Sequence, residues 1–214
     1  MIGKRLSFAA IGTLSLLLAG CDDGENLETM QEATEELDRL KTETVDELNQ
    51  LYATEADLQE AFSDTLETDA ELSTMEDGSS PVFDNIEARE AILSTIEELE
   101  DEMEQHQDTL DSYDGEQLDS EEVTTVSENV NTFQNHLSQY RDRYSSTLNE
   151  QHTYFTGLSD SDATYDDFVA GIQSVNEERD ELRETLLELD EFLVSYRSNL
   201  NTLSSSIDAQ LAED

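Results

Sequence analysis

The chain of 214 residues has a single cysteine, Cys21, and no tryptophan. With one thiol no disulfide can form within the chain, so stability has to come from packing even in an oxidising compartment. The lack of a second cysteine also leaves dithiol redox chemistry without a partner. The sequence has no Gly-x-Ser-x-Gly elbow and no glycine-rich phosphate loop. The chain therefore has no recognisable nucleophile for acyl transfer and no recognisable phosphate-binding loop for a nucleotide. We predict that the protein is not an enzyme.

Basic residues are also scarce, with 10 Lys and Arg against 54 Asp and Glu and a formal net charge of −44 at pH 7. Two of the basic residues and none of the acidic ones lie in residues 1–20, so the remainder carries 8 against 54, a net charge of −46. The negative electrostatic field of such a chain repels nucleic acid and anionic wall polymers. We therefore expect no nucleic-acid partner. The acidity fits a salt-rich habitat, where ionic strength screens self-repulsion. A cation-binding surface is the alternative interpretation.

The N-terminus has the pattern of a bacterial lipoprotein signal. Lys4 and Arg5 precede an apolar stretch over residues 6–18. This stretch is shorter than the roughly 20 residues that a helix needs to cross a bilayer. It ends in a four-residue lipobox, Leu18, Ala19, Gly20 and Cys21. The pattern predicts a signal peptide over residues 1–20, followed by an acylated cysteine and a short linker over residues 21–26.

Acylation would use the only thiol of the chain. Two or more acyl chains, palmitate among them, give stable anchoring, whereas one chain gives marginal membrane binding. We therefore expect Cys21 to anchor the protein in the lipid bilayer, at the extracytoplasmic face of the cell membrane. The alternative is an ordinary secretory signal that leaves Cys21 as a free thiol.

Few prolines and glycines follow the signal, and they mark turns between long periodic segments. Pro81 and the glycines at 78, 115 and 157 separate apolar repeats with steps of three and four residues. These repeats predict a single helical domain over residues 27–214, with helices over about 27–76, 82–113, 120–158 and 165–211. We expect an all-α fold, an elongated antiparallel helical bundle or coiled coil of about four long helices.

The last segment has the most regular apolar seam. Its members are Phe168, Ile172, Val175, Leu182, Leu186, Leu189, Leu193, Tyr196, Leu200, Leu203 and Ile207. Arg179 is the polar residue in this series. A polar residue at such a position commonly fixes register or partner choice; alternatively, its guanidinium reaches a neighbouring carboxylate.

The predicted helix lengths suggest an arrangement. At 1.5 Å per residue the first and last helices would be roughly 75 and 70 Å long, and the middle two roughly 48 and 58 Å. We expect the outer pair to extend past the middle pair as a two-helix stalk at the end that holds both termini. The turns near Gly78 and Gly157 would lie at the far end. A kink at the irregular spacing around Thr44 and Val45 would remove the stalk.

No metal site or cofactor is expected. Asp160 and Asp162 resemble the start of a calcium loop, but its sixth position is Tyr165 instead of glycine, and its twelfth is Gly171 instead of glutamate. The three histidines lack the spacing of a zinc site or a catalytic base: His106, His136 and His152.

Aromatic residues gather around the turn at Gly157. They are Tyr140, Tyr144, Tyr154, Phe155, Tyr165 and Phe168. Tyrosine combines an apolar ring with a polar hydroxyl, which suits contacts with sugars or proteins, although packing at a helix hairpin is the alternative. We select Tyr154, Phe155 and Tyr165 as the candidate contact tip.

Three stretches carry a family resemblance: Ile86–Leu93, Tyr140–Tyr144, and Tyr154–Leu158 leading through Tyr165 to Gln173–Asn176. With the lipobox and the acidic helical body, they make the chain similar to the YkyA-like family of cell-wall-binding lipoproteins of low-GC Gram-positive bacteria. The resemblance implies a wall-associated, extracytoplasmic lipoprotein without an established enzymatic activity. Members of that family are richer in lysine, so the charge of this chain argues against direct electrostatic binding to an anionic wall polymer.

We therefore expect a non-enzymatic, lipid-anchored extracytoplasmic protein that serves as a cell-wall-associated spacer or binding module. One alternative is a coiled-coil adaptor or assembly protein of a membrane complex, with another helical protein as its partner. The other is the acidic cation-binding surface protein.

Overall fold

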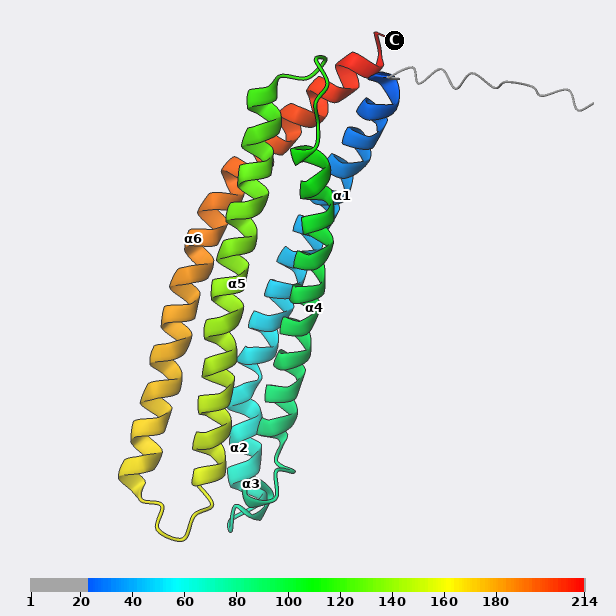
Figure 1. Cartoon of the computed structure of the whole chain (residues 1–214). Coiled ribbons are helices and arrows are strands. Elements are labelled where there is room, and N and C mark those ends of the chain that lie inside the picture. The colour runs from blue at the N-terminus through cyan, green and yellow to red at the C-terminus, as the bar shows by residue number, and fades with distance from the viewer. Residues whose placement is uncertain (1–22, 214) are drawn as a thin grey trace, which may run out of the picture.

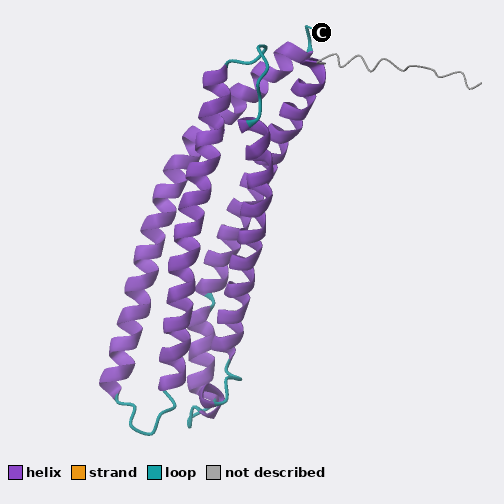
Figure 2. Cartoon of the chain, viewed as in Figure 1, coloured by secondary structure: helices purple, strands orange, loops and turns teal. Residues whose placement is uncertain are grey.

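Helices make up nearly all of residues 23–213, the part of the chain that the computed structural model describes (Figures 1 and 2). The helices are α1 (Asp23–Ala56), α2 (Leu58–Thr68), α3 (Ser73–Glu76), α4 (Pro81–Asp111), α5 (Ser120–Gly157) and α6 (Tyr165–Leu211). No strand occurs within the described residues. The predicted all-α, elongated antiparallel bundle is confirmed.

Local sequence explains where the long helices begin. Pro81 occupies the first turn of α4, and the Ser80 hydroxyl accepts a hydrogen bond from a backbone N–H of that turn. At the start of α6 the Thr164 hydroxyl accepts from the Asp167 N–H at 3.2 Å, and the Asp167 carboxylate accepts from the Thr164 N–H at 2.9 Å. This reciprocal pair satisfies two N–H groups that the helix itself leaves without acceptors.

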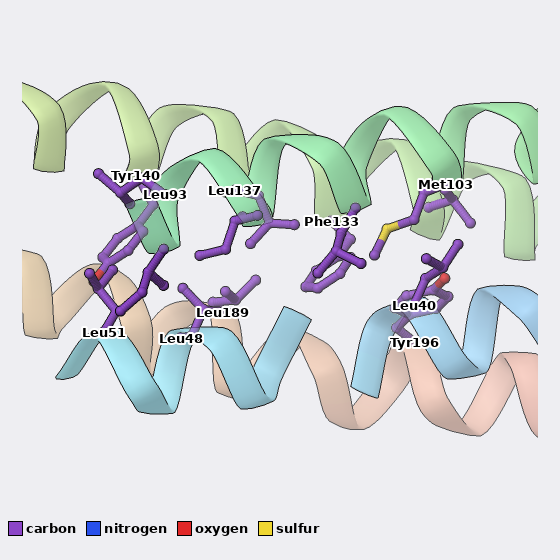
Figure 3. Close-up of a cluster of buried hydrophobic side chains, with 14 of the residues drawn as sticks. Leu40, Leu48, Leu51, Leu93, Met103, Phe133, Leu137, Tyr140, Leu189 and Tyr196 are labelled. Carbon is purple, nitrogen blue, oxygen red and sulfur yellow. The ribbon is translucent and has the colours of Figure 1, made fainter. Parts of the chain in front are cut away.

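The four long helices surround one apolar core. α1 packs along α4 and α6, and α5 packs along the same two helices. Figure 3 shows side chains from all four meeting along the axis, with Leu51, Leu93, Tyr140 and Leu189 among them. Burying a leucine or isoleucine side chain contributes about 1.5–3 kcal/mol, so the seam residues stabilise the bundle along its whole length.

The segment predicted as one helix over residues 27–76 is divided into α1, α2 and α3. The helix does not break at Thr44, which is fully buried and donates its hydroxyl proton to the Leu40 carbonyl at 2.8 Å. Thr44 therefore continues the seam across the irregular spacing. The interruptions come at Asp57 and at Leu72, whose positive φ of 55° is in the left-handed region.

Both ends of the described chain lie together, and the turns around Gly78 and Gly157 lie at the opposite end (Figure 1). We call that opposite end, formed by residues 69–80 and 153–168, the distal end. The predicted two-helix stalk is wrong. The start of α5 reaches the last turns of α6, where the Ser206 hydroxyl lies 2.7 Å from the Glu122 carboxylate. Because residues 57–80 fold into short pieces, the first segment is not the long straight rod that the stalk required.

The seam of α6 is buried unevenly. Its later part, from Tyr196 to Ile207, is buried in the core. At its beginning, Phe168, Ile172 and Val175 are only partly buried. No helix within residues 23–213 is long and apolar enough to cross a membrane.

Candidate functional site

The distal end brings the aromatic residues of the candidate contact tip onto two helices. Tyr154 and Phe155 lie in the last turn of α5, and Tyr165 begins α6. Phe155 is 2% exposed, with its ring centroid 5.3 Å from that of Phe62 on α2. Phe155 therefore packs beneath the candidate contact tip and is not available for direct contact with a partner.

Tyr154 joins the two helices. Its hydroxyl donates to the Phe168 carbonyl at 3.1 Å, and its ring covers Gly171, where a β-carbon would have no room. Partial burial raises the pKa of Tyr154 to about 12, which extends the range of pH over which the protonated phenol can donate this hydrogen bond. Tyr154 is therefore fixed in position between α5 and α6 at the distal end.

Tyr165 is the exposed member of the set. It is 77% exposed, and its ring stacks on Phe168 with centroids 6.2 Å apart. Phe168 in turn lies 6.0 Å from Phe62, so an aromatic row runs from α2 to the tip of α6. This row holds the Tyr165 ring in place while it faces solvent.

Beside this row the α5–α6 turn forms a pocket of about 310 Å³. Tyr154 and Leu158 provide its apolar side, and Asp160, Asp162 and Asp167 provide carboxylates. An aromatic ring next to hydrogen-bond acceptors suits a hydroxyl-rich sugar or an ammonium group, and it disfavours an anion.

A second polar site lies inside the bundle, around Arg89 of α4. The side chain is 0% exposed. Its Nη2 donates to the Gln151 side-chain oxygen at 2.7 Å, and its Nη1 lies 3.4 Å from the Tyr144 hydroxyl. A buried guanidinium needs a countercharge, and Glu55 at the end of α1 supplies it.

Glu55 lies between this cluster and the surface. Burial raises the pKa of its carboxyl, while the Arg89 charge and a hydrogen bond from Tyr144 oppose that shift. Tyr144 is buried as well, and burial raises the pKa of its phenol. The cluster ties α1, α4 and α5 together through one charged network.

Sequence reasoning missed Arg89, although a signal existed. The apolar stripe of the second predicted helix jumps from Ile86 to Leu93, a gap of seven residues. Arg89 occupies the skipped core position, one helical turn from each of them. The structure also joins two stretches of the family resemblance here, because Arg89 belongs to the first and Tyr144 to the second.

Two further carboxyl groups have raised pKa values. Burial raises the pKa of Glu100 to about 7 against the opposing effect of Arg141, whose Nε lies 2.6 Å from the carboxylate. Burial, together with a hydrogen bond to Glu150, raises the pKa of Glu178 to about 7. The Ser174 hydroxyl donates to the Glu178 carboxylate at 3.1 Å, but neither carboxyl group belongs to a recognisable catalytic arrangement, and we assign neither a chemical role.

Histidines and clustered acids do not form a metal centre in the described part of the chain. His152 packs against Phe83, with ring centroids 4.9 Å apart, and His136 packs against Phe192 at 5.7 Å. These histidines therefore pack against the bundle. Arg179, the polar residue of the seam, is 51% exposed, with its guanidinium 4.0 Å from Asp180.

Cys21 and the lipobox residues Leu18, Ala19 and Gly20 lie outside the described residues. Their assignment as a lipidation site therefore stays a prediction from the sequence.

No curated protein and no solved structure matches the chain. A family model described as "Putative cell-wall binding lipoprotein" matches residues 25–206, which includes almost all of the helical bundle. That description names no enzymatic activity, and the resemblance noted from the sequence is confirmed. This chain belongs to the YkyA family of cell-wall binding lipoproteins.

Proposed function

We propose that the protein is anchored to the membrane through acylated Cys21 and acts, without catalysis, as a spacer that presents a binding surface to the cell wall. The observation that supports this most is the position of the chain ends. The start of α1 and the end of α6 lie together, and the α5–α6 turn lies at the opposite end of the bundle (Figure 1). Tyr154 and Tyr165 flank this turn, so the candidate contact tip is at the distal end. An anchor just before α1 would point that surface away from the membrane.

The net charge supports the same orientation. The residues after the signal carry a net charge of −46, which repels anionic lipid headgroups and anionic wall polymers. We therefore propose that the distal surface contacts the neutral, hydroxyl-rich glycan of the wall. Tyr165 would stack on a sugar ring, and Asp160 and Asp162 would accept hydrogen bonds from its hydroxyls.

Cosedimentation tests this proposal. Full-length protein in detergent is mixed with isolated wall, either complete or stripped of anionic polymer, and the bound fraction is measured. We expect binding to both, stronger on stripped wall, and about tenfold weaker binding for Y165A, the size expected for one stacking contact. L187A, which removes another exposed apolar side chain of α6, is the matched control. Absence of binding to stripped wall would overturn the proposal.

The anchor needs a separate test. C21S removes the only acylation site, so incorporation of labelled palmitate should be lost and the protein should leave the membrane fraction. Retention of the label in C21S would contradict acylation at Cys21.

One observation favours an assembly role as a second candidate. Leu187 and Val194 are exposed on α6 and lie seven residues apart, so they share one face of the helix. A second helical chain could cover this stripe. Sedimentation equilibrium separates the candidates: a dimer that persists in high salt and is lost in a L187E/V194E variant favours assembly, and a monomer favours the spacer.

A further inference from the structure

A second pocket lies on the side of the bundle, where α1 ends against α6. Its volume is about 170 Å³. It is lined by Tyr52, Glu55, Ala56, Arg179, Asp180 and Arg183. Glu55 lines this pocket and also belongs to the buried Arg89 cluster, so the two sites are adjacent.

The two arginines of this pocket lie together without a close ion pair in a very acidic protein. Four of the six other basic side chains within residues 23–213 form close ion pairs, such as Arg39 with Glu43 at 2.6 Å and Arg141 with Glu100 at 2.6 Å; Arg89 and Arg197 form none. Arg179 reaches only Asp180, at the limit of 4.0 Å, and within residues 23–213 no carboxylate lies within ion-pair distance of Arg183. Arg183 follows Arg179 by four positions, so both guanidinium groups project from the same face of α6.

Glu55 does not neutralise this pair. Its carboxylate takes a hydrogen bond from Tyr144, and its charge is balanced by that of buried Arg89. Arg179 contributes a smaller attraction to it. Two guanidinium groups against Asp180 leave the pocket about one positive charge, in a chain that is negative almost everywhere else.

We propose that this pocket binds the terminal carboxylate of a peptide. Arg179 and Arg183 would bind the carboxylate, because guanidinium groups form paired, charge-assisted hydrogen bonds with carboxylates. Asp180 would accept a peptide N–H, and the ring of Tyr52, which is 54% exposed, would cover the peptide plane. This role also accounts for a charged residue in the apolar series of α6.

Charge selects a carboxylate over a phosphate. One net positive charge in the pocket matches a monoanion, whereas a phosphate at pH 7 carries more charge. The surrounding field of the protein repels a dianion more strongly than a monoanion. The pocket lies away from the distal end, so this proposal and the wall-binding proposal fail independently.

Nuclear magnetic resonance of the arginine side chains tests the site. Full-length protein labelled with ¹⁵N-arginine is titrated with N-acetyl-diglycine and, separately, with its C-terminal amide. We expect saturable shifts of the Arg179 and Arg183 Nε signals with the acid and none with the amide. R183Q should weaken binding about tenfold or more, the effect of losing one charge-assisted hydrogen bond.

R197Q is the matched control. Arg197 also lies on α6 and is exposed, yet it does not line the pocket, so R197Q removes the same charge and should leave the affinity unchanged. Equal weakening by R197Q and R183Q would reduce the effect to general charge attraction and overturn the proposal. So would the absence of saturable shifts, or tighter binding of inorganic phosphate than of the peptide acid.

Discussion

The ring of Tyr154 on α5 lies where a side chain on Gly171 of α6 would have to be, and the Tyr154 hydroxyl donates to the Phe168 carbonyl at 3.1 Å. This contact fixes the distance between the two helices at the distal end. It holds the start of α6, whose apolar residues are only partly buried there.

Adding a methyl group at this contact should loosen the distal end. In G171A the new β-carbon has to displace the Tyr154 ring, and overpacking of this kind costs about 1–3 kcal/mol of unfolding free energy. Alanine has the better helix propensity by about 1 kcal/mol, which offsets part of the loss. Urea denaturation measures the change.

G157A is the control for that experiment. A β-carbon on Gly157 would meet open space, so this variant should be neutral or slightly stabilised. Equal stability of G171A and G157A would contradict the packing role of Tyr154.

Removing the buried guanidinium should destabilise the whole bundle. R89A leaves Gln151 without its donor and Glu55 without its buried countercharge. Breaking such a site costs about 3–5 kcal/mol. R197A, which removes an exposed arginine, should stay within about 0.5 kcal/mol of the unmodified chain.

The loss in R89A should also depend on pH. With Arg89 gone, the pKa of Glu55 rises further, and protonation then relieves the buried charge. Destabilisation should therefore be smaller at pH 4 than at pH 8. A loss that is equal at both pH values would show that volume, and not charge, explains the effect.

Glu178 should make the protein less stable as the pH rises. Its pKa is about 7 in the folded chain, against an ordinary value of 4.5 that applies after unfolding. Between these values the folded state binds more protons, so the free energy of unfolding falls from pH 4.5 to pH 7. Glu100, with a pKa of about 7, adds to the same fall.

E178Q should reduce this pH dependence. Glutamine cannot lose a proton, so the variant should match the unmodified chain at pH 4 and be more stable at pH 8. E184Q removes one exposed carboxylate from the same helix and controls for the gain that any reduction of the negative charge brings. If E184Q and E178Q gave the same pH profile, the assignment to Glu178 would be wrong.

Salt should stabilise the protein. Because the residues after the signal carry a net charge of −46, raising NaCl from about 0.1 M to 1 M shortens the Debye length from about 10 Å to 3 Å and weakens self-repulsion. Thermal unfolding should shift upward, and choline chloride at the same ionic strength should have a similar effect. Stabilisation by millimolar calcium well beyond its ionic strength would instead favour the cation-binding alternative.

The sequence by itself determined the class of fold and most of the buried stripe. Steps of three and four residues are a local property of the chain, so residues such as Leu189, Tyr196 and Leu203 could be placed in the core without knowing what they face. The turns at Gly78 and Gly157 were predictable for the same reason, because turn residues act locally. Family membership followed from local stretches, and the match over residues 25–206 bears it out.

Only the tertiary structure decided how these pieces meet. The division of the first helix at Asp57 and the absence of a stalk depend on how residues 57–80 pack on their neighbours, which periodicity does not reveal. The pairing of Arg89 with Tyr144 and Gln151 joins residues 55 and 62 positions apart. A buried charge is tolerated only where partners from other helices surround it, so its site was fixed by the assembled bundle.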